Sequence, residues 1–223
     1  MRKRLFVAIT LALSIMLTAC GSNKASVESN STEETQDSNL SAEDSAKQAY
    51  EVLNASADSA DRIMSSVLAA WYFSIDKGND YVLEDYYSGV YDFSNDLGLD
   101  TSAVDTAFKE VIKGTTYETM FTSQAFKEPA ICVKLALQCY QDAGIIDTTK
   151  ELLSDAKQDI KNAESAEPSA SYLEDLKKYH SEIQSYLDYT LSPTGSYKDC
   201  SSEVETYRAN LKTFKNNLAF DLE

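Results

Sequence analysis

Apolar residues recur every three or four positions through most of the chain, which is the pattern of helices that bury one face. The longest run precedes Gly78, which can end a helix in the left-handed conformation, and follows Ser41 and Asp44, which are spaced as a capping box. This run predicts one helix about 50 Å long. Its apolar positions are Ala46, Tyr50, Leu53, Ala57, Ala60, Met64, Val67, Trp71 and Ile75.

A second regular run closes the chain and predicts a helix that faces a partner along its whole length. Its members are Tyr197, Cys200, Val204, Tyr207, Leu211, Phe214 and Leu218. Another helix is expected after Ser171 and ends before Pro193, and a shorter, more polar one covers residues 147–164. Near-antiparallel packing of the long helices follows from the sustained spacing.

Shorter stretches between these runs are also expected to be helical, and glycines separate them. They cover residues 80–97, 102–113 and 129–143, with breaks at Gly98, Gly114 and Gly144. Residues 115–128 fit no period, and no window alternates as a strand does. The sequence therefore predicts an all-α fold, a bundle of long antiparallel helices with several shorter helices and no sheet.

The amino terminus has the features of an export signal. Three basic residues precede an apolar run from Leu5 to Leu17, which is too short to span a bilayer comfortably. The run ends in Leu17-Thr18-Ala19-Cys20, which resembles the lipobox of bacterial lipoproteins. The resemblance implies cleavage before Cys20 and attachment of diacylglycerol to its thiol.

The resemblance divides the chain into three parts. Residues 1–19 are a signal peptide that is removed, residues 20–40 form a lipid-anchored tether, and residues 41–223 form the helical domain. The tether is rich in Ser, Asn, Thr and Glu and spans roughly 25 Å as a flexible coil. We expect the domain on the outer face of the cell membrane, and the excess of Lys over Arg favours a Gram-positive host.

The charge of the chain limits its partners. The formal net charge is −16, and removal of the basic signal peptide makes the mature chain more acidic still. Such a charge repels phosphate backbones and anionic lipid headgroups, so we expect no nucleic-acid partner and no membrane contact other than the lipid on Cys20.

The sequence contains no recognisable catalytic or metal-binding pattern, and we expect no cofactor and no metal site. Its one histidine, His180, flanks an apolar stripe and is expected to be a partly buried packing residue rather than a general base. Cys132 and Cys139 lie two turns apart on one helix, too far apart for a disulfide with each other. Buried thiols are the first expectation, and a disulfide from Cys200 to either of them is the alternative.

Aromatic residues give the only indication of a binding surface. Tyr outnumbers Phe by 14 to 8, and tyrosine is favoured where one end of a side chain stays in water. Apolar and aromatic positions fill about half the circumference of the helix expected at 80–97, which is wider than one partner helix requires. Either a ligand groove or a helix packed between two neighbours explains that width. The candidate ligand-binding residues are Trp71, Tyr72, Tyr86, Tyr87 and Tyr91.

Three functions remain open from the sequence. The first is a membrane-tethered, extracytoplasmic binding or structural module with a protein, peptide or glycan partner. The second is a small-molecule receptor component, which requires an aromatic cavity. The third is an enzyme or redox protein that uses His180 or the unpaired thiols.

Overall fold

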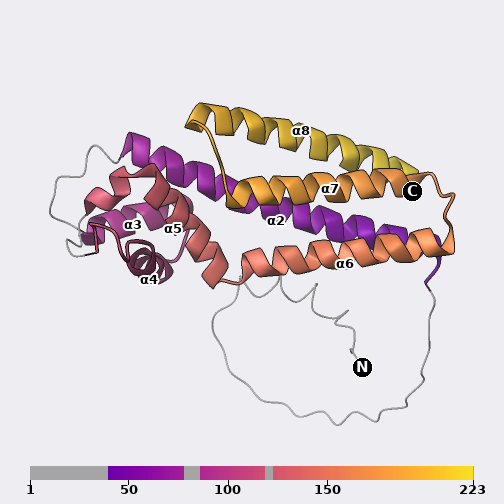
Figure 1. Cartoon of the computed structure of the whole chain (residues 1–223), viewed down its shortest axis with the longest axis horizontal. Helices are drawn as coiled ribbons and strands as arrows, with labels where there is room; N and C mark the ends of the chain where they lie inside the picture. Colours follow the sequence, from indigo (N-terminus) through magenta and orange to yellow (C-terminus); the bar gives the residue numbers. More distant parts are fainter. Residues whose placement is uncertain (1–39, 78–85, 119–122, 223) are drawn as a thin grey trace, which may run out of the picture. The chain divides into compact units, whose positions relative to one another are not determined.

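The computed structural model of the chain describes residues 40–77, 86–118 and 123–222. These residues form helices and turns, with no strand among them, which confirms the all-α prediction for this part (Figure 1). The elements are α2 (Ala42–Asp76), α3 (Tyr86–Leu97), α4 (Thr101–Val111), the 3₁₀ helix η2 (Ser123–Lys127), α5 (Pro129–Asp142), α6 (Ile145–Ala166), α7 (Tyr172–Leu191) and α8 (Tyr197–Asp221).

Several expectations fall outside the described residues. These are the signal peptide, Cys20, the tether up to residue 39, the helix end at Gly78 and the beginning of the helix expected at 80–97. None of the helices in the described ranges combines the length and the apolar character needed to span a bilayer.

Helix α2 begins at the predicted cap. The Ser41 side chain accepts a hydrogen bond from the Asp44 backbone N–H at 3.0 Å, which satisfies one of the free donors of the first turn. The predicted apolar face is buried over most of its length, and Ala46, Leu53 and Met64 are fully enclosed. At 35 residues the helix is about 50 Å long and packs against five other α-helices.

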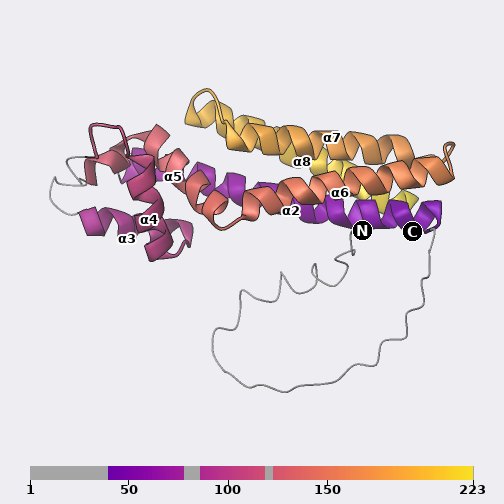
Figure 2. The ribbon, with the colours of Figure 1, turned by 60° about the horizontal axis from the view of Figure 1, so that its bottom comes forward.

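The other long helices, α6, α7 and α8, run alongside α2 and enclose the larger of two core clusters with it (Figure 2). Short turns join consecutive long helices, so α6, α7 and α8 alternate in direction (Figure 1). Each contributes a row of buried residues, represented by Leu153 on α6, Ile183 on α7 and Val204 on α8. The prediction of long antiparallel helices is confirmed for these elements.

The shorter helices build a second core cluster around the end of α2. It joins Phe73 of α2 to buried side chains of α3, α4, η2 and α5. Phe126 lies at its centre, with ring centroids of Phe73, Phe93 and Phe108 at 6.0, 5.7 and 4.8 Å. The stretch 115–128, which has no period in the sequence, therefore supplies a central core residue.

The turn from α5 into α6 occurs at Gly144, one of the predicted breaks. Its φ of 70° is in the left-handed region, which residues with a Cβ rarely adopt. The helix that follows begins two residues before the predicted position 147 and ends two residues after 164. Differences of this size are ordinary at helix ends because end turns fray.

Polar contacts join α2 to α7 and α8. Two of them follow each other seven residues apart along both α2 and α7. The Tyr179 hydroxyl donates to Asn54 at 2.9 Å, and the Tyr186 hydroxyl donates to Asp61 at 2.7 Å. Asp61 also accepts a hydrogen bond from Arg208 Nε at 2.7 Å. A shift of one turn along the helices would break all three, so these contacts favour one register.

Candidate functional site

Two of the predicted ligand-binding aromatics lie near the end of α2. The half-buried Trp71 ring meets the Tyr197 ring edge-on at 6.3 Å, and the Tyr72 ring lies 6.0 Å from the same tyrosine. Tyr72 is 51% exposed. Tyr197 was expected only as a core member of the last helix, yet its position in the first turn of α8 brings it beside the end of α2.

The wide aromatic arc of α3 is divided between core and surface. Val90 and Phe93 are buried, whereas Tyr87 and Tyr91, one turn apart, are 76% and 59% exposed. Tyr86 begins α3, and its side chain lies outside the described part. The buried residues agree with a helix packed against its neighbours, whereas a ligand at the exposed tyrosines stays a prediction. The exposed tyrosines of α2 and α3 lie on helices that are joined through their buried rings, Phe73 and Phe93, at 5.3 Å.

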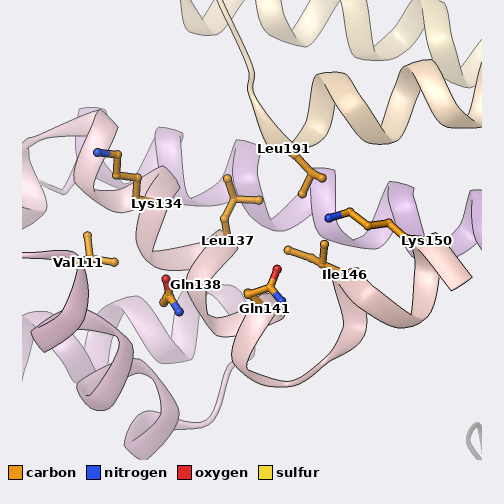
Figure 3. A pocket seen from close by; sticks show the side chains of 8 residues that line it. All are labelled: Val111, Lys134, Leu137, Gln138, Gln141, Ile146, Lys150 and Leu191. Atoms are coloured by element: carbon orange, nitrogen blue, oxygen red, sulfur yellow. The ribbon is translucent and has the colours of Figure 1, made fainter.

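A groove of about 420 Å³ opens where α4, α5, α6 and α7 meet (Figure 3). We call it the α5–α6 groove, and its lining residues are Val111, Lys134, Leu137, Gln138, Gln141, Ile146, Lys150 and Leu191. The aliphatic side chains of Leu137, Ile146 and Leu191 gather between the two lysines. No aromatic side chain lines this groove, so it is not the aromatic cavity that a receptor of the predicted kind requires.

Hydrogen bonds fix the two glutamines of the α5–α6 groove. The Gln138 amide donates to Asp142 at 2.7 Å, and the Gln141 amide donates to Asp147 at 2.8 Å. Each glutamine keeps an amide oxygen that can accept a further hydrogen bond.

A second groove of about 300 Å³ lies between α6 and α7. This α6–α7 groove is lined by Lys157, Ile160, Lys161, Glu164, Lys177 and His180. Lys177 and Glu164 form an ion pair at 2.7 Å across it. His180 lies at one side of the groove, where its Nε2–H donates to the Leu153 carbonyl oxygen at 3.0 Å.

The environment of His180 favours the neutral form of its ring. Burial lowers the pKa of the imidazole, and the positive charge of Lys157 lowers it further, although the hydrogen bond to Leu153 acts in the opposite direction. One ring nitrogen is engaged with the backbone, and no carboxylate of the described residues is hydrogen-bonded to the ring. His180 is half-buried, which agrees with the packing residue that the sequence predicts.

Acidification is expected to destabilise the fold through His180. Because its pKa is lower in the folded than in the unfolded chain, the unfolded state binds more protons as the pH falls below about 6.5. The urea midpoint should therefore fall between about pH 7.5 and 5.5, above the range in which ordinary carboxylates titrate. Urea titrations of wild type and His180→Gln test this: the variant should lose most of the dependence, and an equally steep profile would assign it to other groups.

All three cysteines of the domain are free and buried. Cys200 belongs to the larger core cluster, while Cys132 and Cys139 belong to the cluster around Phe126. Burial raises the pKa of Cys132 and Cys200, and it raises the pKa of Cys139 to about 11. The thiolate is the nucleophilic form, so these environments disfavour thiol chemistry and fit the expected packing role.

Among the residues that the structure describes, no three His, Cys, Asp or Glu side chains lie close enough together to hold a metal ion. Comparison with known proteins gives no family: no family model matches the chain, and no curated protein or solved structure is significantly similar to it.

Proposed function

We propose that the chain is a lipoprotein, anchored through Cys20 to the outer face of the cell membrane, whose helical domain binds a protein partner without catalysing a reaction. The observation that carries the proposal is the exposure of Tyr72, Tyr87 and Tyr91 on two helices whose inner faces are fully packed. Tyrosine combines a large apolar ring with a polar tip and is enriched in protein interfaces.

The surroundings of these tyrosines support a protein partner. Ile75, one turn after Tyr72, is also 48% exposed although it belongs to the predicted apolar face of α2. The ring of Tyr197 contacts both Trp71 and Tyr72, so side chains from α2 and α8 hold one another in place before a partner arrives. Preorganised aromatic side chains lose little conformational entropy on binding.

Lipid anchoring predicts a specific defect. Replacing Cys20 with serine removes the thiol that would form the thioether, so acylation and cleavage after Ala19 should both fail. Labelling of cells with an alkyne fatty acid, followed by gel analysis, should show an unlabelled precursor larger than the wild-type protein. Normal labelling and processing of Cys20→Ser would refute the anchor.

The partner surface is tested on intact cells with a photoreactive amino acid in the full chain. Placed at Tyr91, it should give a protease-sensitive adduct of discrete size, and alanine at Tyr72 and Tyr87 should reduce the yield severalfold. The matched control is Phe220, which is 83% exposed at the far end of α8, about 35 Å along the helix from Tyr197.

Three outcomes would contradict the partner surface. They are equal adducts from positions 91 and 220, an adduct at 91 that the alanine changes leave unaltered, and an adduct that glycosidases remove and proteases do not. The last would identify a glycan instead of a protein.

A further inference from the structure

We propose that the α5–α6 groove binds a small amphiphilic carboxylate, with an apolar body on its aliphatic floor and its single negative charge at one end of that floor, beside one of the two flanking lysines, Lys134 or Lys150. This inference is independent of the proposed partner surface, because the two share no residue. It rests on the shape of the groove, on the ionisable residues that line it and on the carboxylates to which its glutamines are hydrogen-bonded.

The floor of the groove is apolar and comes from several helices. Ile146 of α6 is 3% exposed, and the half-buried Leu137 and Leu191 come from α5 and α7. A volume of about 420 Å³ lies at the lower end of the range typical of small-ligand sites, about 300–1,000 Å³. An apolar body placed here would cover the exposed parts of Leu137 and Leu191, which favours binding through the hydrophobic effect.

The charges that line the groove have the opposite sign to the chain. The protein has 36 acidic and 20 basic residues, yet both ionisable residues of the lining are lysines. Six other lysines of the described ranges form ion pairs, such as Lys109 with Asp105 at 2.7 Å. Lys134 and Lys150 form no ion pair within the described residues. Figure 3 shows them on opposite sides of the aliphatic group.

The nearby carboxylates explain why one negative charge fits better than two. Asp142 and Asp147 are next to the lining, since they accept hydrogen bonds from Gln138 and Gln141. One lysine at the end of the floor compensates a monoanion, whereas a phosphate monoester carries about 1.5–2 negative charges and would be repelled more strongly by this acidic surface. The chemistry of the site therefore favours a carboxylate over a phosphate.

Equilibrium dialysis of labelled decanoate against the full chain tests the proposal, at ligand concentrations below micelle formation. Wild type should bind it saturably with one site, and the neutral decanol should bind at least about tenfold more weakly, which corresponds to about 1.4 kcal/mol. Replacing both Lys134 and Lys150 with methionine keeps the long side chains but removes the charges. This double variant should lose about tenfold in affinity for decanoate and almost none for decanol.

A matched double variant separates site binding from general electrostatics. Lys157→Met with Lys161→Met removes the same charge from the same acidic domain, about two to three turns beyond Lys150 along α6, in the α6–α7 groove. It should change the decanoate affinity less than about twofold, since exposed lysines this far away are screened. Circular dichroism should show both variants folded, because all four lysines are exposed.

The proposal is overturned by the absence of saturable decanoate binding or by equal losses in the two double variants. Tighter binding of decyl phosphate than of decanoate would refute the carboxylate assignment. Crosslinking from position 91 reports on the proposed partner surface, so failure of one site is distinguishable from failure of the other.

Discussion

Replacing Phe126 with alanine is expected to lower the free energy of unfolding by about 3–5 kcal/mol. The side chain is fully buried, and its ring packs against three other phenylalanines, stacking on Phe108 at 4.8 Å. Removing it would leave a cavity that η2 cannot close by itself, because the surrounding rings come from α2, α3 and α4. Domains are typically stable by about 5–15 kcal/mol, so this loss is a large part of the total.

Phe220→Ala is the matched control for Phe126→Ala, since it removes the same atoms from a side chain that is 83% exposed. It should change the free energy of unfolding by less than about 0.5 kcal/mol. Urea unfolding followed by circular dichroism measures both variants. If Phe126→Ala unfolds at the wild-type urea concentration, the cluster around the end of α2 does not contribute to cooperative stability.

The helices could be predicted from the sequence because most of them bury one face, and the spacing of apolar residues reports that face directly. Helix α2 shows the limit of this reasoning. Its buried surface is wider than the predicted stripe and includes Ala49, Ile63 and Phe73, because helices pack around it on several sides. Buried serines hide this width in the sequence, for example Ser56, whose hydroxyl donates to the Val52 carbonyl at 2.8 Å.

The role of Phe126 could not be predicted. It belongs to a 3₁₀ helix of five residues, which is too short to display a period. Its importance arises from rings that the chain brings together from positions 73, 93 and 108. Only the tertiary arrangement of α2, α3 and α4 makes it central.

The candidate surfaces could be predicted from the sequence only in part. The spacing of α3 identified Tyr87 and Tyr91, but it could not tell which half of the arc faces the core, since that depends on where α2 and α4 pack. Tyr197 lies 125 positions after Tyr72, and no local signal connects the two. The α5–α6 groove draws on four helices, so no motif spacing could have revealed it.

The second large loss of stability is expected from a substitution on helix α8. It packs against α7 and α2 and lies at the side of the bundle, so only part of its predicted stripe is enclosed. Cys200, Val204, Leu211 and Leu218 are buried, whereas Tyr197, Tyr207 and Phe214 remain half-buried. The attachment of the helix therefore depends on a few aliphatic contacts, of which Leu211 is near the middle.

Truncating Leu211 to alanine is expected to cost about 2–5 kcal/mol, because the residue is only 7% exposed and its removal leaves a cavity between α8 and its neighbours. Lys212→Ala, one residue farther on and exposed, should change stability by less than about 0.5 kcal/mol. Thermal and urea unfolding of the two variants measure the difference.

Equal stability of the Leu211 and Lys212 variants would show that the stripe of α8 is not core. In that case its apolar residues would have to be exposed often enough to meet a partner, and Leu211→Ala should weaken a complex instead of the fold. A large loss confined to Leu211→Ala has the opposite meaning, because a buried aliphatic residue on α8 can stabilise the domain only while the helix stays packed on α2 and α7. The measurement therefore decides whether α8 belongs to the folded core or to a binding surface.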